Sequence, residues 1–132
     1  MYLLNTDIII YILKGNPSVQ KNLRKHVHDP LKISVITLME LYYGAYKSQK
    51  ITANLAKIKT LEEELEVLPA GQESVEIFGI NKAALEKDGA PLDDFDLIIA
   101  STALTHNLTL VTNNVKHFER IKGLKLENWA VS

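Results

Sequence analysis

The chain has 132 residues and no cysteine. That absence excludes a disulfide framework, thiolate zinc sites and thiol nucleophiles, and it is compatible with a reducing compartment. Long apolar runs are missing as well: none approaches the roughly 18 residues that a membrane-spanning helix needs, and no basic-then-apolar leader opens the chain. We therefore expect a soluble, cytoplasmic protein that does not enter the membrane.

The chain also lacks an excess of either charge, with 15 Lys and Arg residues against 16 Asp and Glu residues. Strong nucleic-acid binding through counterion release is not indicated by such a balance, so any RNA contact must rest on local basic patches. The candidate patches fall early, in the middle and late in the chain: Lys21, Arg24, Lys25 and Lys32; Lys47, Lys50, Lys57 and Lys59; Lys116, Arg120, Lys122 and Lys125.

What is present is the composition of an ordinary globular protein, with 46% hydrophobic and 23% charged residues. A chain of this length buries roughly two thirds of its unfolded surface in one domain, so we expect a single domain over residues 1–132. Short apolar runs predict strands at residues 1–4, 31–35, 65–68, 109–111 and 124–129. Helical spacing between them predicts a three-layer α/β/α sandwich around a parallel sheet.

In parallel sheets of this kind, ligands bind beyond the carboxyl ends of the strands. Four groups of short oxygen-bearing side chains fall at such places and have no histidine ligand spacing, so they suit Mg²⁺ or Mn²⁺ better than zinc. They are Asn5, Thr6 and Asp7; Glu40; Asp93, Asp94 and Asp96; and Thr112, Asn113 and Asn114.

Each group also has a purely structural interpretation. Thr6 or Asp7 can cap a helix that runs to Leu13, and the three acids can cap the helix that continues to about residue 105. Glu40 can complete a capping box with Thr37, for a helix that starts near residue 38. Turn formation accounts for the two asparagines, and surface positions account for all four histidines.

Two further features lie on the helix that carries Glu40. Gly44 follows it one turn later and costs about 1 kcal/mol of helix stability relative to alanine. It is therefore expected to permit close approach of another backbone, a partner or a ligand. Tyr42, Tyr43 and Tyr46 are expected to serve packing or a dimer contact before base stacking.

Four segments, in order along nearly the whole chain, carry a family resemblance. They are residues 4–8 (LNTDI), 33–45 (ISVITLMELYYGA), 96–100 (DLIIA) and 110–118 (LVTNNVKHF), followed by Glu127-Asn128-Trp129. Together they resemble the VapC toxins of the PIN-domain ribonucleases. The resemblance implies a Mg²⁺- or Mn²⁺-dependent endoribonuclease of PIN-like fold, usually a homodimer, which a VapB antitoxin inhibits by laying its C-terminal segment across the active site.

The same resemblance implies an RNA substrate, tRNA before ribosomal RNA and initiator tRNA in particular, and contact with operator DNA only through the antitoxin. Carried over by motif, the family's four acidic positions fall on Asn5, Glu40, Asp96 and Asn114, with the first three as metal ligands. The supporting residues are Thr6, Asp7, Thr112, Asp94 and Gly44.

Asn5 is the serious departure from the family pattern, which has aspartate there; Asn114 is a milder one, because an Asn-Asn pair is familiar at that point. An asparagine keeps one carbonyl oxygen but removes a full negative charge from a site whose metal affinity depends on charge. We therefore predict impaired catalysis. We favour a deliberate inactivating substitution as the explanation, with a natural inactive paralogue as its rival, and Asp7 turning inward is a possible rescue.

Two other functions compete. A receiver-like signalling domain gathers carboxylates around Mg²⁺ on a similar sheet. It needs an aspartate at the end of the third strand, but the third strand expected here ends with Leu68. A regulatory role is the other, in which the chain binds VapB on operator DNA without cutting RNA. A cleavage assay titrated with metal distinguishes that role from a nuclease.

Overall fold

A sheet of parallel strands forms the centre of the computed structural model, which describes residues 1–131. The strands are β1 (Tyr2–Leu4), β2 (Leu31–Ser34), β3 (Glu66–Leu68), β4 (Thr109–Val111) and β5 (Leu126–Glu127). Their order across the sheet is β3-β2-β1-β4-β5, and each neighbouring pair is parallel. The parallel sheet expected from the alternating pattern is confirmed, with β1 at its middle.

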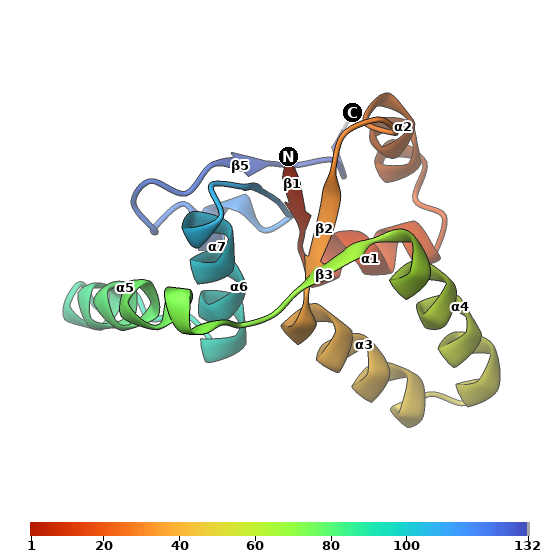
Figure 1. The fold of residues 1–132 in the computed structure, drawn as a ribbon, viewed down its shortest axis with the longest axis horizontal. Coiled ribbons are helices and arrows are strands. Elements are labelled where there is room, and N and C mark those ends of the chain that lie inside the picture. Colours follow the sequence, from red (N-terminus) through yellow and green to blue (C-terminus); the bar gives the residue numbers. More distant parts are fainter. Residues whose placement is uncertain (132) are drawn as a thin grey trace.

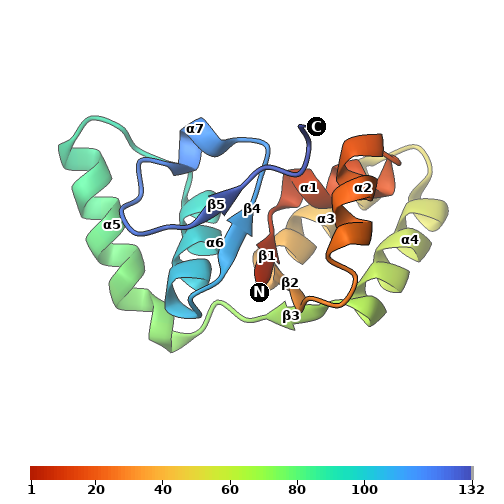
Figure 2. The same ribbon diagram turned by 90° about the horizontal axis from the view of Figure 1, so that it is seen from above.

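Helices cover both faces of this sheet, which confirms the three-layer arrangement (Figures 1 and 2). On one face lie α1 (Thr6–Leu13), α2 (Pro17–Lys25), α3 (Val35–Lys47) and α4 (Ile51–Glu64). On the other lie α5 (Val75–Lys87), which a 3-10 turn at Gln72–Ser74 precedes, α6 (Asp94–Thr105) and α7 (Val115–Phe118). Within residues 1–131, no helix is both long and apolar enough to cross a bilayer.

The core is divided by the sheet, as two neighbouring residues of β1 illustrate. Leu3 packs into the cluster that contains Leu97 and Leu110, on the α6 side. Leu4 packs into the opposite cluster with Ile8 and Val111. All of these side chains are 0 or 1% exposed, which explains why β1 is apolar without alternation: both of its faces are covered.

Several boundaries differ from those expected. The helix that carries Glu40 begins at Val35, not near residue 38, because Ser34 is its N-cap: the Ser34 hydroxyl accepts a hydrogen bond from the Ile36 N–H at 3.0 Å. The last strand spans only Leu126–Glu127, the two residues that pair with Leu110 and Val111 of β4. The strands β1, β2 and β3 are each one residue shorter than expected.

Candidate active site

The candidate site lies where β1, β2 and β4 end, since these three strands are neighbours and run in the same direction. Asn5 follows β1, α3 with Glu40 follows β2, and Thr112 follows β4. In Figure 1 the helices α1 and α3 start at the same end of the sheet, away from the N-terminus. Because α3 packs against α6, Asp96 in the first turn of α6 joins the group.

Asn5 is the N-cap of α1, which corrects the expectation that Thr6 or Asp7 caps this helix. Its backbone carbonyl accepts from the N–H groups of Ile8 and Ile9, at 3.1 and 3.2 Å. Its side chain accepts no capping bond, and its Nδ2 donates to Thr112 Oγ1 at 3.2 Å. The side chain is 6% exposed, and its Oδ1 has no hydrogen-bond partner among the described residues.

Asp7 is held by the loop that follows β4. Its Oδ2 accepts from the Thr112 hydroxyl at 3.1 Å and from the Asn113 N–H at 2.9 Å. Its Oδ1 accepts from the Ile8 N–H at 2.8 Å. With three donors already bound, the Asp7 carboxylate lies against this loop, and an inward turn would break these contacts.

Glu40 is free to face the site because it takes no part in capping α3. Its Oε1 accepts a hydrogen bond from the Thr6 hydroxyl at 2.8 Å, and Thr6 Oγ1 also lies 3.0 Å from Thr37 Oγ1. The capping box of Thr37 and Glu40 is therefore wrong: Thr37 lies inside the helix. Burial raises the pKa of Glu40 first, and the charges of Asp96 and Asp93 raise it further, against the opposing hydrogen bond from Thr6.

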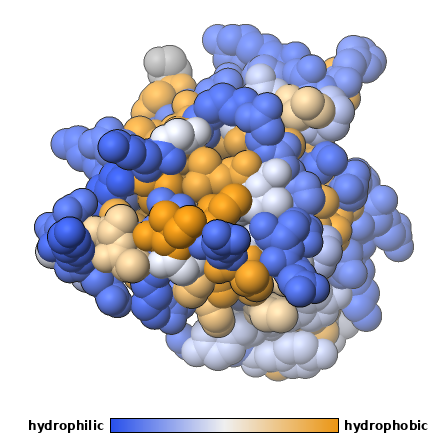
Figure 3. All heavy atoms as spheres, turned by 60° about the vertical axis from the view of Figure 1, so that its left-hand side comes forward, coloured by the Kyte–Doolittle hydropathy of each residue, from blue (hydrophilic) through white to orange (hydrophobic). Residues whose placement is uncertain are grey.

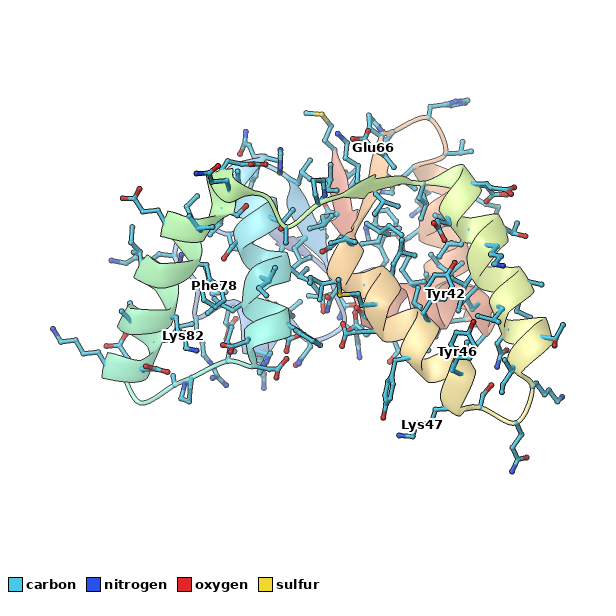
Figure 4. The ribbon with its side chains drawn as sticks, turned by 60° about the horizontal axis from the view of Figure 1, so that its bottom comes forward. Tyr42, Tyr46, Lys47, Glu66, Phe78 and Lys82 are labelled. Carbon is cyan, nitrogen blue, oxygen red and sulfur yellow. The ribbon has the colours of Figure 1, made fainter. Side chains whose placement is uncertain are left out.

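The three acids at the start of α6 have three different environments. Asp93 is the N-cap, and its carboxylate accepts from the Phe95 N–H at 3.1 Å. Asp94 pairs with Lys82 of α5 at 2.9 Å, so its side chain is drawn toward that helix and away from the site. Figure 4 shows Lys82 beside Phe78, on the side of α5 that faces α6. Asp96 is the acid that shares the site with Glu40.

Asp96 is half-buried, and its Oδ2 lies 3.1 Å from Nε2 of His117. Burial is the main cause that raises the pKa of Asp96, and the charges of Asp93 and Asp7 raise it too. The hydrogen bond and the charge of His117 act in the opposite direction. The surface position expected for His117 is therefore wrong. Its place, one helical turn after Asn114, was the signal that could have revealed it.

Asn114 and Gly44 lie at the edge of the site. Asn114 is exposed, and within residues 1–131 its side chain has no hydrogen bond, while its backbone N–H donates to Thr112 Oγ1 at 3.1 Å. A Cβ added to Gly44 would meet no atom within 4 Å, so close approach of this chain's own backbone does not explain the glycine.

Gly44 instead lines a groove of about 270 Å³ between α1, α3 and α4, which Glu40 also lines. Leu13, Leu41 and Ile58 give the groove an apolar floor. Beside it, Tyr42 extends from α3 toward α4 (Figure 4), where its hydroxyl donates to Glu62 at 2.8 Å. Tyr42 therefore serves packing, as expected, whereas Tyr43 and Tyr46 are 66 and 63% exposed.

The donor atoms fit a hard divalent cation in kind. The carboxylates of Glu40 and Asp96 both have raised pKa values, and the charge of Asp96 contributes to the shift of Glu40, as a nearby like charge does. The Asn5 Oδ1 is a buried oxygen without a donor. Oxygen ligands suit Mg²⁺ and Mn²⁺. Among residues 1–131, no group of three or more histidine, cysteine, aspartate or glutamate side chains is placed to hold a metal ion.

Comparison with known proteins places this geometry in a family. A family model for the PIN domain matches residues 2–124. Ribonuclease VapC2 of Rickettsia felis is 38% identical over 131 residues, which is 98% of each chain. The tRNA(fMet)-specific endonuclease VapC of Shigella flexneri is 36% identical over 129 residues, again 98% of each chain.

Solved structures give the same result. The VapBC2 complex of Rickettsia felis bound to a promoter DNA fragment matches with a TM-score of 0.91 and 39% identity, over 97% of this chain and 98% of that one. The DNA-bound VapBC of Salmonella typhimurium matches with a TM-score of 0.89 and 35% identity, over 97% of both chains. The chain therefore belongs to the PIN-domain family and, within it, to the VapC ribonucleases.

Proposed function

We propose that this chain is the toxin endoribonuclease of a VapBC toxin–antitoxin module and that it hydrolyses phosphodiester bonds in RNA with Mg²⁺ or Mn²⁺. Asn5, Glu40 and Asp96 would hold the ion. The observation that carries the proposal is the unpartnered Oδ1 of Asn5 in a site with two carboxylates of raised pKa. The RNA we propose is initiator tRNA, because the Shigella flexneri relative is a tRNA(fMet)-specific endonuclease.

The ion, when bound, would supply positive charge against the phosphate and activate water for attack. The protein's own side chains hold the ligands in place. Thr6 binds Glu40, Thr112 binds Asn5, and His117 binds Asp96, each through one hydrogen bond of 2.8 to 3.2 Å.

Asn5 removes one negative charge from this ligand set, and we propose that this loss impairs catalysis. Two carboxylates and an amide carry a formal charge two units negative, whereas an aspartate at residue 5 would add a third negative charge. Divalent cation affinity depends on ligand charge, so the ion binds more weakly to the present set. The amide nevertheless keeps one oxygen atom that could bind the ion, because its Oδ1 has no hydrogen-bond partner among the described residues.

The test is cleavage of initiator tRNA in Mn²⁺ by the present chain and by Asn5→Asp. We expect faster cleavage by the variant, and equal rates would contradict the impairment. Asp96→Asn in the Asn5→Asp background is the matched control, since it removes one charge from the same site. Cleavage that survives this control would show that another site or a contaminant is responsible.

A VapB-type antitoxin is the proposed partner, with operator DNA contacted only through it. Three solved relatives are VapBC structures, two of them bound to DNA. The groove between α1, α3 and α4 is a suitable place for an antitoxin segment because it is apolar and opens beside Glu40. Copurification of the chain with a coexpressed tagged antitoxin, and its failure to shift operator DNA when alone, test both parts.

We also propose a homodimer. Met39, Tyr43 and Tyr46 form an exposed apolar row on one side of α3. Val75 and Ile80 of α5 are 62 and 61% exposed. Figure 3, which brings the α5 side forward, shows apolar residues gathered on that face.

A purely regulatory role is the second candidate function. The observation that favours it is the amide at residue 5, which removes a negative charge from the proposed ligand set. Such a protein would bind the antitoxin and, through it, operator DNA, but would cleave RNA at no Mn²⁺ concentration. The same cleavage assay separates the two candidates. A measurable rate that disappears in Asp96→Asn excludes the regulatory role as the only one.

A further inference from the structure

One buried hydroxyl connects the two unusual residues at the start of α1. Thr112 is 0% exposed, and its Oγ1 has three polar partners. Asn5 Nδ2 lies at 3.2 Å, the backbone N of Asn114 at 3.1 Å, and Asp7 Oδ2 at 3.1 Å. Asp7 Oδ1 is a fourth, longer neighbour at 3.3 Å.

The proton count of this hydroxyl determines which way the Asn5 amide is turned. A hydroxyl donates one proton and accepts at two lone pairs. The Asp7 carboxylate can only accept, so it takes the proton of Thr112. The Asn114 N–H can only donate and fills one lone pair. The remaining lone pair requires a donor, which is the NH₂ group of Asn5, so the carbonyl oxygen of Asn5 must face the other way.

We propose that Asp7, acting through the Thr112 hydroxyl, is a positioning residue that fixes the Asn5 amide with its carbonyl oxygen free for a cation. This inference rests on the metal site of the proposed function. It gives Asp7 a role that needs no inward turn of its own carboxylate. It also explains why a side chain only 6% exposed has an oxygen without a donor.

A second consequence concerns charge at residues 5 and 7. A carboxylate at residue 5 would face Thr112 Oγ1 and would need a hydrogen bond from the Thr112 hydroxyl. That hydroxyl already donates its one proton to Asp7. Two carboxylates would then share one donor, and their charges would repel each other in a largely buried network. The structure therefore accommodates a carboxylate at either residue, but not at both without loss of a hydrogen bond.

Exchange of the two side chains would restore the network in reverse. The NH₂ group of an asparagine at residue 7 would donate to Thr112, and the hydroxyl would donate to an aspartate at residue 5. The Asn113 N–H would lose its acceptor in the exchange, but Asn113 is exposed and water can replace that bond. The net charge of residues 5–7 would not change.

The test is a double-mutant cycle of four full-length proteins: the present chain, Asn5→Asp, Asp7→Asn and the exchanged double variant. Thermal unfolding in EDTA and Mn²⁺ binding by calorimetry are the two readouts. We expect Asn5→Asp to lower the Tm by a few degrees and the double variant to regain it. We expect the double variant to bind Mn²⁺ about tenfold more tightly than Asn5→Asp alone. Additive effects on both readouts would overturn the inference.

Thr112 provides the control for simple loss of charge at Asp7. Thr112→Val leaves Asp7 charged but removes the connecting hydroxyl, so Mn²⁺ binding should weaken about tenfold, while Thr112→Ser should retain it. Thr102→Val is a matched control, because Thr102 is also 0% exposed and its hydroxyl donates only to the Ile98 carbonyl. Equal Mn²⁺ affinity in Thr112→Val and Thr112→Ser would also overturn the inference.

Neither readout uses RNA, so the inference and the proposed function can fail separately. A non-additive cycle, with no cleavage by any of the four proteins, would support the positioning role of Asp7 and contradict the nuclease. Faster cleavage by Asn5→Asp, with an additive cycle, would support the nuclease and overturn the positioning role.

Discussion

Nε2 of His117 lies 3.1 Å from Oδ2 of Asp96, which joins the short helix α7 to the acidic start of α6. Asp96 is half-buried, and because we propose it as a metal ligand, it needs a partner that keeps it ionised and oriented. His117 does both, since its hydrogen bond and its charge lower the pKa of Asp96 against the effect of burial.

His117→Leu should therefore weaken Mn²⁺ binding by about tenfold and slow RNA cleavage in the Asn5→Asp background. His117→Gln should retain most of the affinity, because its amide can donate to Asp96 from nearly the same place as Nε2. Calorimetric titration with Mn²⁺ measures the effect. His106→Leu is the matched control: this histidine pairs with Glu73 at 3.5 Å, outside the site. Equal losses in His117→Leu and His106→Leu would argue against a specific role.

Glu40→Gln should stabilise the metal-free protein at pH 7. The pKa of Glu40 is raised above its ordinary value of 4.5, so the folded state holds this proton more tightly than the unfolded state. The free energy of unfolding therefore falls as the pH rises through the window between the two pKa values, and it stays lower above that window. The glutamine of the variant has no such dependence and can still accept the Thr6 hydrogen bond.

Urea unfolding in EDTA at pH 7 and pH 4 measures this difference. The variant should have the higher midpoint at pH 7, and the gap should close at pH 4, where Glu40 is largely protonated in both states. A gap of the same size at both values would mean that Glu40 is not the cause. Whichever unfolding result is obtained, Glu40→Gln should lose RNA cleavage.

Gly44→Ala should stabilise the protein by about 1 kcal/mol, because a Cβ at this helical position meets open space and alanine is the better helix former. Gly79→Ala in α5 is the matched comparison, with equally open surroundings. Thermal unfolding should show a similar gain for both. A loss of stability in Gly44→Ala would show that the groove wall cannot accept a side chain.

Gly44→Trp should fill the groove beside Glu40 and weaken antitoxin binding at least tenfold, while Gly44→Ala binds normally. The two variants differ in volume at one point, so their comparison isolates occlusion from stability. Fluorescence polarisation with a labelled antitoxin peptide measures the affinity. Normal binding by Gly44→Trp would place the antitoxin on another surface.

If the proposed homodimer uses the exposed apolar side of α5, Ile80→Glu should shift it to monomer, because the variant introduces a charge there. Ile51→Glu at the start of α4 is the matched control, since it is the same substitution at an isoleucine that is 39% exposed. Sedimentation velocity at micromolar concentration distinguishes the two species. An unchanged distribution for Ile80→Glu would exclude this face as the dimer contact.

Strand and helix alternation was sufficient to predict the architecture, because hydrophobic periodicity records which faces are buried. Leu3 and Leu4 are both apolar since helices cover both faces of β1. The start of α3 was less predictable. Ser34 and Thr37 are both good N-caps, and local sequence cannot tell which of them ends the strand. Because of that ambiguity, the sequence did not reveal that Glu40 takes no part in capping α3.

Contacts between distant segments explain the rest of what sequence could not predict. The partners of Asn5 and Asp96 are 107 and 21 residues away along the chain, and no local pattern records them. The same applies to Asp94, whose pairing with Lys82 depends on how α5 packs against α6.

The hydrogen bond between Asn5 and Thr112 also has a consequence during protein synthesis. Asn5 leaves the ribosome 107 residues before its hydrogen-bond partner Thr112. A nascent chain has no Thr112 to turn the amide and no His117 to hold Asp96. The proposed site can therefore assemble only after residue 117 has left the ribosome, and it is absent while the preceding residues are being made.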